Sequence, residues 1–296
     1  MKNCIAFLTA LLPFFVSAQL DVRIDESPKS FSKGNYPAYQ IDLPKSRLEK
    51  TEKDWMNYIQ KGAKGKPALV NGEVVMQNAV SPNISAAPFN VYSTLLETTA
   101  GVRLTSWFSQ NNDSLFFSNA IGDRNLAVEK YLHDFAVQEY KEIVQNELND
   151  ENAKLKKLQG ELKDLYNEQD KSNKKSSQLQ RSIMRNRDEI NVNDNDQANK
   201  QAQIDRQKQI VEEQKSNPGP ALDAAKKALR GYERDLDKLI NKKERLYKQI
   251  DNWSAHSNAE DRDSNDAMAG QRKKYAEIDH QKAVIQVVKN RLDAIK

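Results

Sequence analysis

The sequence predicts an α+β protein, in which a small, mostly antiparallel β-rich head with one or two helices precedes a long antiparallel α-helical coiled-coil hairpin. Three observations predict this fold. Seven of the nine prolines lie between Pro13 and Pro88, and no phenylalanine follows Phe135, so turn and core residues concentrate in the first part. The second part repeats apolar residues in alternating steps of three and four, which is the period of a coiled coil. One passage, SNPGP at 216–220, interrupts this repeat.

Residues 1–18 have the order of parts found in a secretory signal peptide. Lys2 precedes an apolar run that ends in small residues at Ala18, after which cleavage is expected. The run is too short to span a bilayer, which disfavours a transmembrane segment in the mature chain. Cys4 is the only cysteine and lies within this segment, so the mature chain is expected to form no disulfide. The sequence therefore predicts an exported protein, periplasmic or secreted.

The charge balance argues against a nucleic-acid partner. Residues 19–140 hold 13 Lys and Arg against 14 Asp and Glu, and residues 141–296 hold 32 against 28. A surface that binds nucleic acid by neutralising phosphates is more basic than either part. We therefore expect a protein partner, self-association through the coiled coil, or contact with a cell-envelope glycan.

Residues 19–140 are expected to form the head domain. A strand is predicted at 38–43, and a helix at 46–62 is predicted to be capped by Ser46 and ended by Gly62. Four residues of this helix share one apolar face. They are Leu48, Trp55, Tyr58 and Ile59.

The rest of the head is predicted to be a meander of strands. Asn71-Gly72 separates two short β-prone runs and suits the positive-φ positions of a type I′ hairpin turn. Further strands are expected at 89–98, 101–110 and 114–119. The second of these alternates two sets of side chains, as a half-buried antiparallel strand does. The inward set is Val102, Leu104, Ser106 and Phe108, and the outward set is Arg103, Thr105 and Trp107.

A helix is predicted from Asp123, its N-cap, with a broad apolar face that should pack on the sheet. That face comprises Val128, Tyr131, Leu132, Phe135, Tyr140 and Ile143. Residues 141–296 are then expected to form the hairpin, because the face narrows to a seam. Its first half is Leu148, Glu151, Leu155, Leu158, Leu162, Leu165, Gln169, Ser172, Ser176, Leu179, Ile183, Asn186, Ile190, Asn193, Gln197, Lys200, Ile204, Gln207 and Val211. Its second half is Leu222, Ala225, Leu229, Tyr232, Leu236, Leu239, Lys243, Leu246, Ile250 and Trp253, resuming at Ile278, Ile285, Val288, Leu292 and Ile295.

The turn between the two halves is predicted at 216–220. A proline inside a helix costs ~3 kcal/mol or more, and two of them flank Gly219, so one helix should end and a second should begin with Pro220 at its first position. Helices joined by so short a loop are usually antiparallel neighbours. Folding about Gly219 places residue 219−k opposite 219+k, which sets the polar span 169–176 against 262–269.

The polar middle of the seam leaves an alternative open. Residues 170–177 and 254–270 are rich in serine, asparagine and charge. If both were loops, four shorter helices could condense into a bundle. Neither passage contains proline, which favours the long hairpin.

Side chains that support catalysis or metal binding are sparse. The three histidines, His133, His256 and His280, have no second histidine or cysteine at ligand spacing. Residues 261–272 match the first ligands of an EF-hand loop, but Arg272 stands where that loop needs a bidentate glutamate. We therefore predict no catalytic, cofactor-binding or metal-binding residue, and no cofactor.

Two features of the head have ordinary explanations. Asp113-Ser114 lies in a turn without a partnered histidine, so a nucleophilic serine is not expected. A set of aromatic residues could line a pocket but is expected to form core. They are Trp55, Tyr58, Tyr92, Trp107, Phe116 and Phe117.

These observations favour a non-enzymatic, exported structural or adaptor protein. Its long coiled-coil arm would provide protein–protein interaction or spacing in the cell envelope. The alternative is a head that binds a glycan or small ligand and is presented on a coiled-coil stalk. Carboxylate chemistry of a hydrolase is the least favoured reading, because pairs of carboxylates are ordinary on charged helices.

Overall fold

The structure is a computed structural model that describes residues 22–118 and 124–295. The predicted signal peptide, Cys4 and the N-cap at Asp123 therefore lie outside the described residues. The chain divides into two compact units. The head unit contains the described residues up to Lys154 together with those from Gln281 onward, and the hairpin unit contains Leu155–His280. The boundary expected at 140/141 falls inside a helix, and the head unit continues beyond it.

The head unit contains a six-stranded sheet in which all neighbouring strands are antiparallel. In their order across the sheet the strands are β1 (Ile24–Phe31), β2 (Gly34–Pro44), β6 (Gly101–Gln110), β5 (Phe89–Thr98), β4 (Glu73–Ala79) and β3 (Ala68–Val70). Helix α1 (Leu48–Gln60) is inserted between β2 and β3. The structure confirms the predicted α+β head, and β3 to β6 form the predicted meander.

Two segments of the head differ from the prediction. The sequence analysis did not predict β1, whose residues IDESPKSF are mostly polar and include Pro28; β1 forms because β2 pairs with it along its whole length. The strand expected at 114–119 is reduced, in its described part, to one bridge between Phe116 and Ser109. Asp113 adopts a φ of 55° there, which turns the chain sharply after β6.

The two tight turns of the meander depend on glycine. Asn71 and Gly72 have φ values of 53° and 81°, as the predicted type I′ turn requires. Gly101 opens β6 with a φ of 152°, and a Cβ on it would lie 2.1 Å from the carbonyl oxygen of Leu43. Gly72, in contrast, has no atom within 4 Å of such a Cβ. Gly101 is therefore required for close approach of two backbones, and Gly72 only for its dihedral angles.

Gly101→Ala is expected to destabilise the protein by about 3 kcal/mol, because strain and a backbone clash add together. Gly72→Ala is the matched control, with an expected loss of about 1 kcal/mol from backbone strain alone. Urea denaturation followed by tryptophan fluorescence measures both. Equal losses for the two variants would contradict the close contact between β6 and the end of β2.

Helix α1 and the start of α2 (Arg124–Gln214) cover one face of the sheet and form the main core. The broad apolar face predicted for α2 is confirmed for its central residues. Ser46 does not cap α1, because the N-cap is Arg47 and makes no side-chain capping bond. The residues of this core are Tyr39, Ile41, Leu43, Trp55, Ile59, Val74, Met76, Ala79, Ile84, Phe89, Val91, Leu104, Phe108, Phe117, Val128, Leu132, Phe135 and Ala136.

The opposite face of the sheet carries a second cluster, so β6 is not half-buried as predicted. Trp107 is buried, and its ring stacks on Phe31 with centroids 4.5 Å apart. Exposed Tyr36 stacks on Phe116, a member of this cluster, with ring centroids 4.0 Å apart. Of the predicted outward set, only Arg103 is exposed. The six aromatic residues singled out in the sequence all belong to these two clusters or pack against them.

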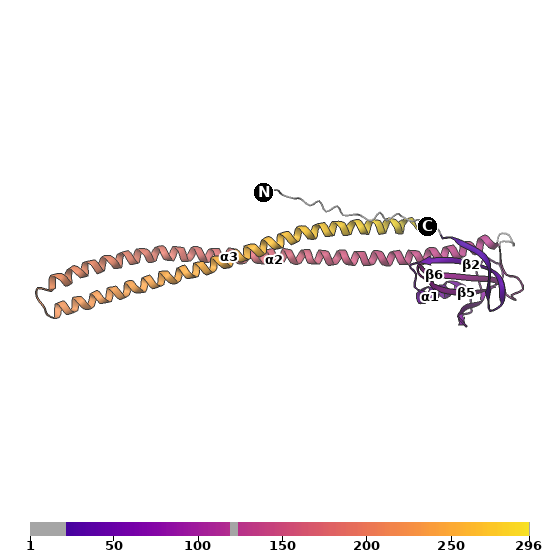
Figure 1. The fold of residues 1–296 in the computed structure, drawn as a ribbon, viewed down its shortest axis with the longest axis horizontal. Coiled ribbons are helices and arrows are strands. Elements are labelled where there is room, and N and C mark those ends of the chain that lie inside the picture. Colours follow the sequence, from indigo (N-terminus) through magenta and orange to yellow (C-terminus); the bar gives the residue numbers. More distant parts are fainter. Residues whose placement is uncertain (1–21, 119–123, 296) are drawn as a thin grey trace. The chain divides into compact units, whose positions relative to one another are not determined.

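The hairpin prediction is confirmed. Helix α3 (Pro220–Ala294) begins at Pro220, and the amides of Leu222 and Asp223 donate to the carbonyl of Gly219. Within the hairpin unit α2 and α3 run side by side to the loop between them (Figure 1). Both helices continue unbroken through 170–177 and 254–270, so the four-piece bundle is wrong. The predicted seam residues that lie in the hairpin unit are all buried or half-buried.

The register within the hairpin unit is close to the one predicted from Gly219. Side-chain hydrogen bonds join Gln169 to Gln271 at 2.9 Å, Ser176 to Ser257 at 3.0 Å, and Asn186 to Gln249 at 3.0 Å. The observed partners lie within five residues of those that the 219±k rule gives. Polar residues of the two helices thus hydrogen-bond across the seam, and they contribute to the register together with apolar clusters such as that of Ile183, Ile190, Leu246 and Ile250.

Candidate functional site

The residues considered for chemistry in the sequence remain separate or structural. His256 and His280 are exposed on α3, 24 positions apart and therefore about 36 Å apart along the axis. His133 is half-buried on α2 in the head unit, with Nδ1 3.8 Å from Asp134. Residues 261–272 are α-helical, so they do not form a loop of the EF-hand kind.

Asp113 is the centre of a hydrogen-bond network that ties the loop after β6 to the sheet. Its carboxylate accepts from Asn90 Nδ2 at 3.0 Å, from the Tyr92 hydroxyl at 2.8 Å and from Ser109 Oγ at 2.7 Å. Burial opposes ionisation of this group, but the hydrogen bonds outweigh it and hold the pKa of Asp113 below its ordinary value. These bonds hold the loop, and the hydroxyl of neighbouring Ser114 donates to Gln110 at the end of β6 and to Asn112.

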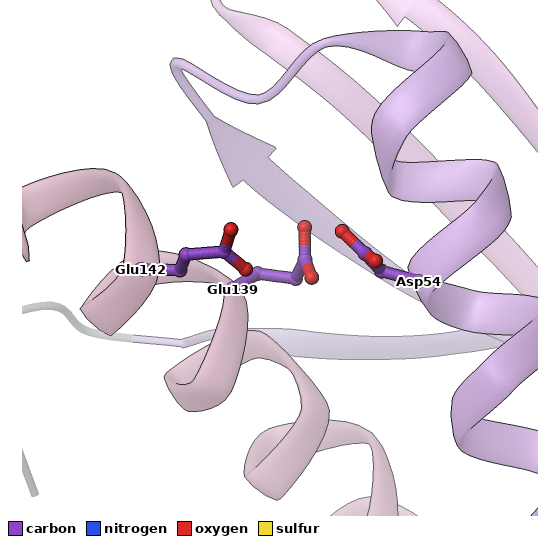
Figure 2. Close-up of side chains that lie close together, drawn as sticks. All are labelled: Asp54, Glu139 and Glu142. Carbon is purple, nitrogen blue, oxygen red and sulfur yellow. The ribbon is translucent and has the colours of Figure 1, made fainter. Parts of the chain in front are cut away.

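The structure brings together three carboxylates that the sequence analysis did not single out. The carboxylate cluster consists of Asp54 on α1 and Glu139 and Glu142 on α2, with one oxygen from each lying within 4.8 Å of the others. Figure 2 shows the three side chains converging from the two helices, with the carboxylate of Glu139 between the other two. The cluster therefore spans the contact between α1 and α2 in the head unit.

Helical spacing explains why Glu139 is buried. It lies four residues after Phe135 and four before Ile143, so it falls on the apolar face by which α2 packs on the head. Its side chain is 2 % exposed. The available sequence signal was an acidic residue within an apolar stripe, but its partner Asp54 is 85 positions away and could not be inferred from spacing.

Lys50 neutralises part of the carboxylate cluster. Its Nζ donates to Asp54 Oδ2 at 2.5 Å and lies 2.9 Å from Glu142 Oε2. Burial works against the ammonium, but these two carboxylates raise the pKa of Lys50 above its ordinary value. Glu139 Oε1, in contrast, is buried without a hydrogen-bond partner among the described residues.

Glu139 is the perturbed acid of the site. Burial raises its pKa to about 7; the Lys50 ammonium opposes this shift, while Asp54 and Glu142 reinforce it. Glu139 can therefore hold a proton close to neutral pH. The group can take up a proton or a cation in a range where ordinary carboxylates are fully ionised.

A cavity of about 670 Å³ adjoins Glu139. It lies between the residues that lead into α1 and the stretch of α2 up to Lys154. Three buried oxygens without a partner in the described part of the chain belong to residues of its lining: Ser46 Oγ, Thr51 Oγ1 and Glu139 Oε1. The lining residues are Lys45, Ser46, Arg47, Lys50, Thr51, Glu139, Ile143, Asn146, Glu147, Asp150, Glu151, Ala153 and Lys154.

The lining of this cavity is largely polar and charged. It combines cationic, anionic and hydroxyl groups, and contains no histidine or cysteine. A serine or threonine nucleophile would need a base to activate it, and neither hydroxyl makes a hydrogen bond to one within the described residues. The groups suit a polar or cationic ligand, since unpaired buried oxygens favour occupants that can complete their hydrogen bonds or coordination.

Among the residues that the structure describes, no helix is both long and apolar enough to cross a membrane. Comparison of the chain with protein-family models, with curated proteins and with solved structures found no match.

Proposed function

We propose that the protein is an exported, non-enzymatic adaptor whose coiled-coil arm provides protein–protein contact or spacing in the cell envelope. The observation that carries this proposal is a stripe of two exposed apolar pairs along the flank of the α3 seam in the hairpin unit, with Ser254 and Asp261 between the pairs. Ile240 and Tyr247 are seven residues apart, as are Met268 and Tyr275, and 21 residues separate the two pairs. Multiples of seven place all four on one face of a coiled-coil helix.

This stripe lies outside the seam. Its four side chains are 36 to 48 % exposed, whereas the a and d positions beside them are buried or half-buried against α2. The hydroxyl of Tyr275 lies 2.8 Å from that of Tyr166, also exposed, so the apolar surface extends onto α2. Aromatic and methionine side chains are enriched where proteins meet, and on a helix otherwise covered with charge they mark a contact surface.

Site-specific crosslinking in intact cells tests the proposal. A photo-reactive amino acid at Tyr247 is expected to capture a protein or a second copy of the chain, because the stripe faces the partner. The same amino acid at exposed Arg245, two residues earlier and about 200° around the helix, is the matched control and should capture much less. Equal capture at both positions, or none at either, would contradict the proposed contact surface.

The cavity beside Glu139 favours a second candidate function, a head that binds a glycan or another small polar ligand. The specific observation behind it is a cavity of about 670 Å³ with a largely polar and charged lining, in which three residues each have a buried oxygen without a partner in the described part of the chain. Calorimetric titration of the full chain with cell-wall glycan fragments tests this candidate. The expected result is saturable binding that Thr51→Val weakens; binding unaffected by Thr51→Val would place the ligand elsewhere.

A further inference from the structure

We propose that the carboxylate cluster, Asp54, Glu139 and Glu142, is a site for a divalent cation of the Ca²⁺ class that joins α1 to α2. Hard cations take carboxylate and hydroxyl oxygens as ligands. Oxygens on opposite sides of a Ca²⁺ ion lie ~4.8 Å apart, since each bond is about 2.4 Å. The cluster oxygens lie within 4.8 Å of one another, so they can reach one ion without a change of backbone. This inference is independent of the adaptor function proposed above.

The buried oxygen of Glu139 is the observation that points to a ligand. Glu139 is 2 % exposed, and its Oε1 has no hydrogen-bond donor among the described residues. Figure 2 shows its carboxylate directed between those of Asp54 and Glu142. Glu139 shares a hydrogen bond with Asp54, but a buried carboxylate oxygen that lacks a donor, as Oε1 does, is unfavourable unless the group binds a proton or a cation.

Thr51 supplies a second, separate indication. Its side chain is 1 % exposed, its Oγ1 has no partner in the described part of the chain, and it lines the same cavity as Glu139. A threonine hydroxyl is a neutral oxygen ligand of the kind that hard cations accept. Ca²⁺ usually has six to eight ligands, so hydroxyl and water oxygens would complete what the three carboxylates begin.

The charge of the cluster fits a doubly charged ion. Once a cation displaces the proton of Glu139, three ionised carboxylates face the single ammonium of Lys50, which leaves two negative charges for the ion to neutralise. Lys50 contacts Asp54 and Glu142, whereas Glu139 Oε1 has no hydrogen-bond partner among the described residues, so Lys50 does not complete the neutralisation. The Lys50 side chain is 42 % exposed, and its ammonium can withdraw into solvent when a cation enters. The Lys50 ammonium thus competes with the cation for the carboxylates of Asp54 and Glu142.

This competition gives opposite expectations for two variants of the full chain. Glu139→Gln should weaken Ca²⁺ binding by about tenfold or more, because it removes the central anionic ligand. Lys50→Met should strengthen it by about tenfold, because it removes the competing positive charge while retaining the packing of the stem. If Lys50 and the carboxylate cluster form an ion-pair network that binds no cation, neither variant should bind Ca²⁺.

Terbium luminescence and calorimetry measure this binding. Tb³⁺ replaces Ca²⁺ at oxygen sites, and Trp55 next to Asp54 in the chain is a near donor of excitation energy. After removal of metals with a chelator, the wild type is expected to show one saturable site that Ca²⁺ competes for, with Kd in the range of about 0.1 to 1 mM. Asp261→Asn, in the helical EF-hand-like segment of the hairpin unit, is the matched control and should leave binding unchanged.

These titrations distinguish a cation site at the carboxylate cluster from a site elsewhere and from no site. Saturable binding that falls in Glu139→Gln and rises in Lys50→Met supports the site. No saturable response in wild type and Lys50→Met up to about 10 mM Ca²⁺ overturns it, as does a response lost in Asp261→Asn but retained in Glu139→Gln. If Lys50→Met fails to fold, Lys50→Gln carries the same expectation, and circular dichroism verifies the fold of each variant before titration.

Discussion

Glu139→Gln should remove most of the pH dependence of the stability of the head unit between pH 4.5 and pH 7. The pKa of Glu139 is raised to about 7 from an ordinary value of 4.5, so the folded protein binds a proton that the unfolded chain has released in this range. The contribution of Glu139 to the free energy of unfolding of the wild type is therefore largest below pH 4.5. This contribution falls as the pH rises toward 7 and stays constant at higher pH.

The size of this effect is large for one side chain. Each unit of pKa corresponds to about 1.4 kcal/mol, so the wild type is expected to lose about 3 kcal/mol of its free energy of unfolding across the range. Glutamine keeps the shape of the protonated acid and has no charge to bury beside Lys50, Asp54 and Glu142. The variant should therefore have a nearly flat profile in that range.

Urea denaturation from about pH 4 to about pH 8, with a chelator present, measures these profiles. Glu97→Gln is the matched control, because Glu97 is exposed on β5 and should keep the slope of the wild type. A Glu139→Gln profile as steep as that of the wild type would show that Glu139 titrates normally and that its burial is relieved in solution.

Replacement of Pro218, Gly219 and Pro220 together by alanine should convert the hairpin into a single long helix. The two prolines oppose helix continuation by about 3 kcal/mol each, and alanine removes that barrier while adding good helix formers. The seam residues of such a straight helix lose their partners within the chain. A second copy then satisfies them, so the variant is expected to associate as an exchanged antiparallel dimer with an unbroken helix.

Sedimentation equilibrium checks this result, since the mass of the variant should be twice that of the wild type. Gly231→Ala is a suitable control because Gly231 lies within α3 and has open space around its Cα. It should stabilise the helix by about 1 kcal/mol without a change in mass. A triple variant with the wild-type mass would show that contacts along the seam, and not the turn, determine the direction of α3.

The hairpin could be predicted because its determinants are local and repeated. A period of 3.5 residues appears in every stretch of the seam, and Pro218-Gly219-Pro220 excludes helix at one place only. Even the serine-rich middle keeps the 3.5-residue period, since Ser176 meets Ser257 across the seam. The exposed stripe from Ile240 to Tyr275 has the same spacing, but its four members are diluted among charged residues and were not singled out.

The head was predicted less fully because its determinants are distant in the chain. The segment that forms β1 is polar and contains Pro28, and only its pairing with β2 makes it a strand. The alternation of β6 placed Trp107 in the outward set although its aromatic ring was expected in a core, and Phe31 and Phe116 cover it from outside that strand. The carboxylate cluster combines residues of two helices, and only the position of Glu139 in an apolar stripe gave a local sign of it.

The two outer strands of the sheet also affect how the folded head behaves at high concentration. An open sheet can recruit another chain along its free backbone and so begin fibril growth. At one side β1 carries Pro28, which has no amide hydrogen to offer an incoming strand, and at the other side β3 is only three residues long. Both borders are poor templates for polymerisation, so the head should resist aggregation even where it is crowded by many copies of itself.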